Sequence, residues 1–427
     1  MGSEQHVDAI VVGGGPAGST AAAVLARAGR SVAVLERARF PREHIGESLL
    51  PHVWYTLDRI GAVDLVAKAG FQRKHSVRFV SADGRMSRPF LFQEHKDHPS
   101  SQTWQVERAT FDRLLLEHAE ASGAVVHQGT RAKALIEEDG RVVGVRAEGP
   151  DGPLELRAPW TIDASGRDGF VRTLRGWRNR EEALERLSYW TYYRGIEVDP
   201  QTAHATTVVQ VPEDGWFWFF PMGDGRLSVG VVARREVLHR HGKDPATVWE
   251  EVIKLNPWLA ERLQGGERVA PIEVTSDYSY RSTYSADDGV VLTGDAFAFL
   301  DPVFSSGVFL AVRTGEEAAR GVLSALDDGR TDAGVFAAYG EWVCRGIEAM
   351  RSLVFSFYDP DFSMGALVRA HPELHGDVTD LLIGDLFRDY ADLQQALAEL
   401  GTVPPVLGYG GARVQSVEAR PPTAGAA

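Results

Sequence analysis

A glycine-rich turn between two short apolar segments limits most strongly how this chain can fold. Residues 7–12 (VDAIVV) favour a strand, the turn at 13–18 reads GGGPAG, and the alanine-rich stretch 19–28 is typical of a helix. A second apolar segment, 31–35 (SVAVL), ends at Glu36. The order predicts a βαβ unit whose helix N-terminus holds a pyrophosphate and whose acidic residue meets a ribose hydroxyl. A GxGxxG pattern alone recurs by chance, but in this complete context it predicts dinucleotide binding.

Composition and charge exclude several classes of protein. The 427 residues suffice for two or three packed units around a large cofactor. The net charge of −14, without a long block of Lys or Arg, argues against nucleic acid or an anionic membrane as partner. Cys344 is the single cysteine, and His239 and His241 are the only two histidines that lie two residues apart, so neither a disulfide nor a metal site is expected. The N-terminus lacks the features of a signal peptide, which predicts a cytoplasmic protein.

The remaining segments predict an α/β fold with a discontinuous nucleotide-binding domain. A helix at 109–122 and short strands up to residue 162 continue that domain, while strands within 76–92 and 187–275 predict an inserted mixed sheet. Helical patterns dominate after residue 307, and 408–427 has the composition of a poorly ordered end. The expected domains are a nucleotide domain at 1–75, 105–185 and 280–340, a substrate-binding sheet at 76–104 and 186–279, and a C-terminal helical region at 341–427.

Residues 301–307 (DPVFSSG) place two serines and a glycine inside an apolar run. The apolar residues on both sides predict a buried turn, whose backbone N–H groups need partners other than bulk water. A cofactor edge, an anion or neighbouring backbone are the three candidates. A long helix expected at 307–325 gives a further possibility, in which Ser305 or Ser306 simply caps that helix.

Several short motifs resemble the flavoprotein fold that aromatic hydroxylases, geranylgeranyl reductases and flavin-dependent halogenases share. They are the glycine turn, Glu36, Arg108, residues 163–166 (DASG) and the pair Gly294-Asp295, and the resemblance spans about residues 6–340. It implies a Rossmann-like FAD-binding domain of the aromatic-hydroxylase type. Apart from the resemblance, the ordinary alternatives are that Asp295 caps a helix and that Arg108 lies on the surface. The FAD contacts that it implies are Gly13, Gly15, Pro16, Ala17, Gly18, Glu36, Arg37, Gly46, Glu47, Ser48, Arg108, Asp163, Gly294, Asp295, Pro302, Gly307 and Val308.

Three further stretches resemble the flavin-dependent halogenases in particular. They are 44–51 (HIGESLLP), 215–221 (GWFWFFP) and the turn at 301–307. The resemblance implies an enzyme of natural-product biosynthesis that uses reduced FAD, O₂ and chloride or bromide. The N–H groups of Ser306 and Gly307, at a helix N-terminus, form a positively polarised nest that suits a halide.

The same resemblance assigns a catalytic role to Lys74. Halogenases place a lysine at the end of a tunnel, where it hydrogen-bonds hypochlorous acid or, as a neutral amine, forms a chloramine. Trp216 and Trp218, two apart on a strand, face one side and separate the flavin from the substrate, or are plain core. Tryptophan halogenases carry Glu where this chain has Phe304, so a phenolic or pyrrolic ring, free or carrier-tethered, is the expected substrate.

The partners and the competing functions follow from what the sequence lacks. No second GxGxxG follows a strand, so a separate flavin reductase is expected, although single-domain flavin hydroxylases also bind NAD(P)H without one. An FAD-dependent aromatic monooxygenase is the alternative enzyme, and a flavin-binding protein without turnover is the third reading. An acyl or peptidyl carrier protein has one candidate docking site, the arginines of 167–180, which otherwise form a solvated face. Covalent attachment of FAD stays open.

Overall fold

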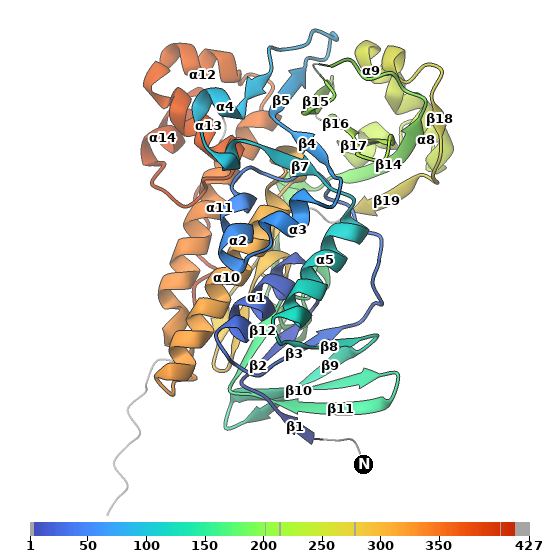
Figure 1. The fold of residues 1–427 in the computed structure, drawn as a ribbon. Helices are drawn as coiled ribbons and strands as arrows, with labels where there is room; N and C mark the ends of the chain where they lie inside the picture. The colour runs from blue at the N-terminus through green and yellow to red at the C-terminus, as the bar shows by residue number, and fades with distance from the viewer. Residues whose placement is uncertain (1–3, 201, 213–214, 277–278, 402, 415–427) are drawn as a thin grey trace, which may run out of the picture.

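The computed structural model describes residues 4–200, 202–212, 215–276, 279–401 and 403–414. Figure 1 shows an elongated molecule with the nucleotide-binding sheets at one end and a large sheet beside the C-terminal helices at the other. Within these residues, no helix combines the length and the apolar run that crossing a bilayer requires.

The expected βαβ unit lies at the centre of a six-stranded sheet. Strand β2 (Ala9–Val12) pairs in parallel with β3 (Val32–Glu36), and α1 (Pro16–Arg27) connects them. All neighbours in the sheet are parallel except the edge pair β21 and β22. The strand order is β21 (Ala286–Asp287), β22 (Val290–Leu292), β12 (Trp160–Asp163), β2, β3 and β8 (Val125–Gln128).

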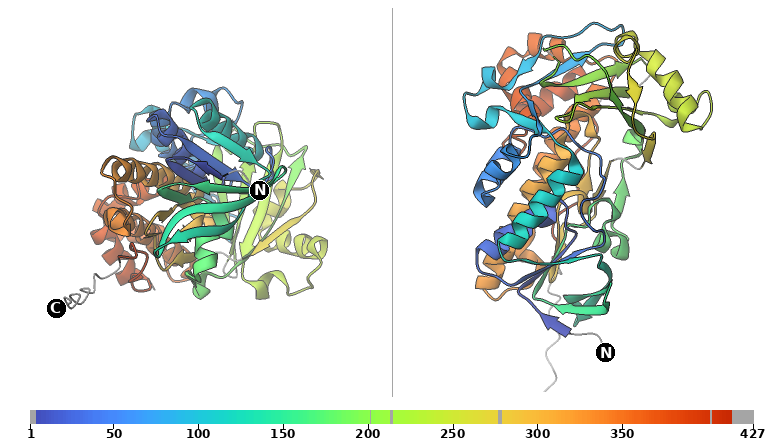
Figure 2. Two further views of the ribbon diagram at one scale, coloured as in Figure 1. Left: turned by 90° about the horizontal axis from the view of Figure 1, so that it is seen from below. Right: turned by 45° about the vertical axis from the view of Figure 1, so that its right-hand side comes forward.

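Different elements pack against the two faces of this sheet. Ala9 and Val11 pack with α1, α5 (Arg108–Ala121) and α10 (Ser306–Asp327). On the opposite face, Ile10 and Val12 pack against a four-stranded sheet in the order β1 (Glu4–His6), β11 (Gly152–Arg157), β10 (Arg141–Gly149) and β9 (Arg131–Glu138). The turned views of Figure 2 show this second sheet beside the N-terminus. The nucleotide-binding end therefore has three layers.

The large sheet has a face toward the cofactor end and a face toward its own helices. Trp216, Trp218 and Phe220 belong to the main core, whereas Phe217 and Phe219 pack beneath α8 (Pro245–Val252) and α9 (Pro257–Arg262). The strand order is β18 (Glu267–Arg268), β14 (Leu187–Arg194), β17 (Leu227–Ala233), β16 (Gly215–Pro221), β15 (Ala205–Val211), β5 (Ser76–Val80) and β6 (Phe90–Leu91), with β19 (Glu273–Ser276) beside β14.

Short elements complete the chain between these layers. Strand β4 (Gln72–Lys74) pairs with β7 (Thr103–Gln105), and β20 (Tyr280–Ser282) joins β13 (Arg178–Arg180) to β23 (Ala298–Phe299). The shorter helices are α2 (Val53–Ile60), α3 (Val63–Ala67), α4 (Phe92–His95), α6 (Phe170–Arg175) and α7 (Arg235–Leu238).

The C-terminal region is helical, as expected, but the segment after it is ordered further than its composition suggested. Its helices are α11 (Ala337–Tyr358), α12 (Met364–Ala370), α13 (His375–Ile383) and α14 (Ala391–Leu400). Gly410 N–H donates to Thr283 O at 2.9 Å and Arg413 N–H donates to Ala286 O at 2.8 Å. These bonds use only backbone groups, so side-chain composition does not reveal them. Residues 415–427 lie outside the described part.

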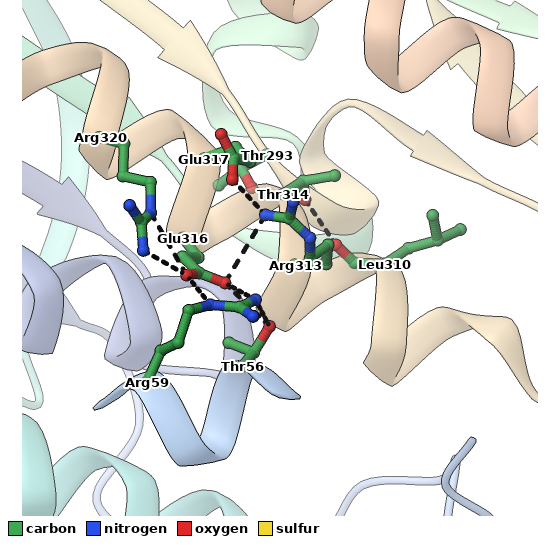
Figure 3. Close-up of polar contacts among 9 residues, drawn as sticks. All are labelled: Thr56, Arg59, Thr293, Leu310, Arg313, Thr314, Glu316, Glu317 and Arg320. Atoms are coloured by element: carbon green, nitrogen blue, oxygen red, sulfur yellow. Dashed lines mark hydrogen bonds and ion pairs between the residues drawn. The ribbon is translucent and has the colours of Figure 1, made fainter. Parts of the chain in front are cut away.

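A buried carboxylate ties α10 to α2. The Glu316 side chain is 1% exposed, and Figure 3 shows Arg59, Arg313 and Arg320 converging on it. Arg59 Nη2 donates to Glu316 Oε2 at 2.6 Å, and Thr56 Oγ1 donates to the same oxygen at 2.9 Å. Burial alone raises the pKa of Glu316, but the Arg59 guanidinium outweighs it and the pKa is lowered. The ionised carboxylate therefore fixes both helices.

Helices α1 and α10 cross at a point that has no room for a side chain on Gly315. A Cβ atom at Gly315 lies only 2.4 Å from Ala17 O, which is backbone and cannot move aside alone. We expect Gly315→Ala to lower the free energy of unfolding by about 1–3 kcal/mol, because it forces the helices apart. Urea unfolding followed by fluorescence measures this. Gly376→Ala is the control, since a Cβ there meets nothing within 4 Å. Equal stability of the two variants contradicts the expectation.

Candidate active site

The N-terminus of α1 offers free donors. Helix α1 begins at Pro16, its N-cap residue Gly15 has no side chain to cap it, and no acidic residue occupies its first turn. No described residue accepts a hydrogen bond from the N–H of Gly15 or Ala17. Glu36 accepts from Gly14 N–H at 2.8 Å through Oε2, so the acidic residue lies directly beside the turn. Unpaired N–H groups at a helix N-terminus fit the diphosphate of a dinucleotide.

Asp295 lies in a short turn that a threonine network holds against α10. In Figure 3, Thr314 Oγ1 lies between Thr293 and the carbonyl of Leu310. It accepts from Gly294 N–H at 2.9 Å and donates to Leu310 O at 2.6 Å, which fixes the turn that carries Asp295. Burial raises the pKa of the Asp295 carboxyl to about 6, against nearby arginines that lower it. Its carboxyl group has no hydrogen-bond partner among the described residues, so it is free for a hydroxyl of the cofactor.

Three other predicted cofactor residues have partners of their own. Arg108 binds Asp112 through two nitrogens and donates to Ile45 O at 2.7 Å, and so fastens the segment that precedes Glu47. Asp163 Oδ1 accepts from Ser165 N–H in the turn that follows it, and Oδ2 accepts from Val171 N–H in α6. Arg37 is half exposed and pairs with a surface aspartate. Contacts of these three with FAD stay predictions.

The arginines of 167–180 do not form one solvated face. Arg172 is 1% exposed, and its guanidinium lies 4.0 Å from the centre of the Tyr280 ring. Arg178 lies over the same ring at 4.5 Å, and Arg175 pairs with Glu137. Arg172 and Arg178 therefore lie against Tyr280 of β20, and only the remaining arginines of this range are available to a docking partner.

Within the described part of the chain, the turn before α10 leaves unpaired the two backbone N–H groups that we expected, from the sequence, to bind a halide. Pro302 starts the 3₁₀ turn Pro302–Phe304, Ser305 adopts the left-handed conformation with φ +57°, and α10 begins at Ser306. Ser305 occupies the N-cap position but makes no side-chain capping bond. No described residue accepts from the N–H of Ser306 or Gly307, and a Cβ at Gly307 meets nothing within 4 Å. The geometry matches an anion site better than a capped helix.

Trp216 and Trp218 lie on one face of β16, as the period of a strand predicts. Their ring centres are 5.9 Å apart, and the side chains are 2% and 4% exposed. Phe304 belongs to the same core and packs edge-on against Phe357. Trp218 lies across from Gly230 on β17, where a Cβ atom falls 2.2 Å from the indole. The two indoles therefore form a tightly packed wall.

Lys74 is fully buried without a counter-ion. It ends β4, is 1% exposed, and donates from Nζ to Ser48 Oγ at 2.9 Å and to Leu49 O at 3.0 Å. No carboxylate among the described residues lies within ion-pair distance. Burial lowers the pKa of Lys74 from its usual 10.5 to about 7. Ser48 Oγ also lies 2.7 Å from Thr206 Oγ1, so both acceptor and lysine are fixed.

Glu47, next to Ser48, is the second buried titratable group of this segment. It is 2% exposed, and burial raises the pKa of its carboxyl to about 7. Tyr192 Oη donates to Glu47 Oε1 at 2.8 Å. Tyr192 and Thr206 belong to the large sheet, and no motif in the sequence pointed to either. Glu47 and Lys74, which is bonded to Ser48, thus bring two groups with shifted pKa values to one segment, a property typical of active sites.

Comparisons with known proteins identify the family of this chain. Residues 6–341 match the family described as FAD binding domain. A 1H-pyrrole-2-carbonyl-(peptidyl-carrier protein) chlorinase of Pseudomonas fluorescens is 30% identical over 408 residues, covering 90% of each chain. This chain belongs to the flavin-dependent halogenases. A similar brominase of Pseudoalteromonas luteoviolacea is 30% identical over 91% of this chain and 94% of its own.

The halogenase is also similar in structure to enzymes of this family. A solved flavin-dependent brominase superposes with a TM-score of 0.83 at 27% identity, covering 93% of this chain and 97% of that chain. The expected α/β fold, FAD as cofactor and a halide as co-substrate are confirmed, and the hydroxylase alternative is not favoured.

The burial of Lys74 predicts a pH-dependent cost to folding. Between about pH 7 and 10.5 the unfolded chain holds a proton on Lys74 that the folded chain has lost, so this group's contribution to stability rises with pH across that window. We expect Lys74→Met to raise the free energy of unfolding more at pH 6 than at pH 10. Urea titrations at several pH values measure this. Lys68→Met, which changes an exposed lysine, is the control, and an equal effect at both pH values contradicts the assignment.

Proposed function

We propose that this halogenase chlorinates or brominates an electron-rich pyrrole ring carried on a peptidyl carrier protein, with Lys74 presenting the halogen. The observation that carries the proposal is the buried amine of Lys74, whose pKa of about 7 makes both protonation states accessible near neutral pH. Reduced FAD, when bound, supplies with O₂ the two-electron oxidation that turns halide into hypohalous acid. The remaining roles fall to side chains and backbone groups of this chain.

Lys74 has two chemically balanced routes to halogen transfer. As an ammonium group it donates a hydrogen bond to hypohalous acid and orients it toward the ring. As a neutral amine it forms an N–halogen bond while hydroxide leaves and combines with the amine proton as water. In either route the halogen, carrying no bonding electrons, adds to a ring carbon, which then loses its proton. Ser48 and the carbonyl of Leu49 aim the amine in both routes.

The absence of a carboxylate at Phe304 supports an activated ring as substrate. Phe304 is 6% exposed and packs against Phe357, so this position contributes shape rather than a base. A pyrrole or phenol is electron-rich enough to react without such a base, whereas a less activated ring benefits from one. The two relatives that act on a pyrrole-2-carbonyl carrier protein favour the pyrrole.

The proposed partners are a flavin reductase and the substrate carrier. Among the described residues the structure has one nucleotide-binding βαβ turn, at Gly13, which is the site for FAD. Reducing equivalents then come from a separate reductase that delivers reduced FAD. The halide is held by the N–H groups of Ser306 and Gly307 at the start of α10.

Product analysis of Lys74→Ala tests the proposed role. We expect wild type, supplied with FAD, a flavin reductase, NADH and bromide, to brominate pyrrole-2-carbonyl loaded on a peptidyl carrier protein, and Lys74→Ala to lose at least about a hundredfold in rate. Mass spectrometry detects the bromine isotope pattern. Lys68→Ala is the matched control. Halide-independent products of +16 mass that persist in Lys74→Ala contradict the proposal, and bromination of a free phenol instead overturns the substrate class.

Gly307→Ala separates the halide role of the turn from its structural role. A methyl group at Gly307 meets no atom within 4 Å, and alanine is a better helix former by about 1 kcal/mol, so thermal stability should stay equal or rise. We expect the KM for bromide to rise, because the methyl group intrudes on the space in front of the N–H donors. Steady-state kinetics with varied bromide measure this. An unchanged KM places the halide elsewhere.

A further inference from the structure

A buried chain of three polar side chains links the C-terminal helices to the turn before α10. Trp216 Nε1 donates to Tyr358 Oη at 2.9 Å, and Tyr358 Oη donates to Asp301 Oδ2 at 2.8 Å. Tyr358 is the last residue of α11, and Asp301 is 0% exposed. The chain therefore joins β16, α11 and the residue that begins the turn.

Asp301 determines how that turn is built. Its Oδ1 accepts from Val303 N–H at 3.0 Å, which caps the 3₁₀ turn Pro302–Phe304. Ser305 N–H then donates to Pro302 O at 2.8 Å, and Ser305 takes the left-handed conformation that directs the chain into α10. The direction of the N–H groups at Ser306 and Gly307 follows from this short segment, which one carboxyl group anchors.

We propose that Tyr358 is a positioning residue for halide binding: through Asp301 it holds the turn in the conformation that aims the N–H groups of Ser306 and Gly307. The inference rests on the proposed halide role of these two groups. It adds Tyr358 and Asp301 to the residues on which halide use depends, although neither touches the halide.

The balance of polar contacts shows why the tyrosine hydroxyl matters. Burial raises the pKa of the Asp301 carboxyl to about 6, against hydrogen bonds from Tyr358 and Val303 that lower it. Tyr358→Phe leaves Asp301 Oδ2 and Trp216 Nε1 without that partner inside the core. Buried polar groups that lose a partner move or draw in water, and either response shifts a turn that a single carboxyl group anchors.

The experiment compares the removal of two tyrosine hydroxyls, each of which accepts a hydrogen bond from a tryptophan N–H. Tyr193 Oη accepts from Trp249 Nε1 at 2.7 Å in the separate core beneath α8, so Tyr193→Phe removes a matched hydrogen bond away from the turn. The FAD-loaded proteins are titrated with bromide, and the bromide-dependent rise in the thermal midpoint gives an apparent Kd. The KM for bromide and kcat are measured separately.

We expect Tyr358→Phe to raise both the apparent Kd and the KM for bromide roughly tenfold, with kcat at saturating bromide changed far less. Tyr193→Phe should lose similar stability but keep the bromide values of the wild type. Unchanged bromide binding in Tyr358→Phe overturns the inference while leaving the halogenase proposal standing. A wild type whose midpoint does not respond to bromide overturns the halide role of the turn and the inference with it.

A double-mutant cycle tests the route through Asp301. Because Tyr358 acts through a direct contact, Tyr358→Phe should add little to the Kd change of Asp301→Asn, so the double variant resembles Asp301→Asn alone. Fully additive changes show that the hydroxyl acts by another route and overturn the assignment of Asp301 as the link.

Discussion

The close approach of α1 and α10 at Ala17 and Gly315 is the constraint on which the rest of the site depends. Helix α1 begins at the turn that we expect to hold the diphosphate of FAD, and α10 begins at the turn that we propose to hold the halide. Gly315 lies nine residues after Ser306, so the crossing point and the halide turn are separated by about 13 Å along α10. Because a buried helix is stiff, this spacing does not adapt to the cofactor. Arg59 of α2, bound to Glu316, holds the same helix next to this crossing point.

The site combines several groups that are buried with few partners. Lys74 has two acceptors and no counter-ion, and Glu47 and Asp301 are buried carboxyl groups with raised pKa values. In each, loss of water disfavours the charged form, so the proton is gained or lost close to neutral pH. The burial that lowers the pKa of Lys74 costs folding free energy, and it makes accessible the neutral amine that we propose for halogen transfer, because an amine with an ordinary pKa is almost never neutral at pH 7.

The parts of the fold that the sequence predicted depend on local pattern, and those it missed depend on contacts between distant residues. The glycine turn before Pro16 and the shared face of Trp216 and Trp218 follow from spacing alone. Tyr358 and Asp301 are 57 residues apart, and Lys74 and Ser48 are 26 apart, so only the folded chain brings each pair together. Of the strands expected within 76–92, the second covers only Phe90–Leu91, because Phe92 begins a helical turn.

The barrier that we expect between flavin and substrate depends on two strands, because the Trp218 indole of β16 fills the space beside Gly230 of β17. The indole occupies space that any residue with a Cβ at position 230 would need. A smaller residue at 218 therefore opens a gap, and a larger residue at 230 fills it only if Trp190, whose Cβ lies 2.6 Å from a Cβ at Gly230, also moves. An attempt to widen or reroute the passage for a bulkier ring has to treat the two positions as one unit. Gly230, a residue without a side chain, thus contributes as much to the packing of this wall as the indole that fills the space beside it.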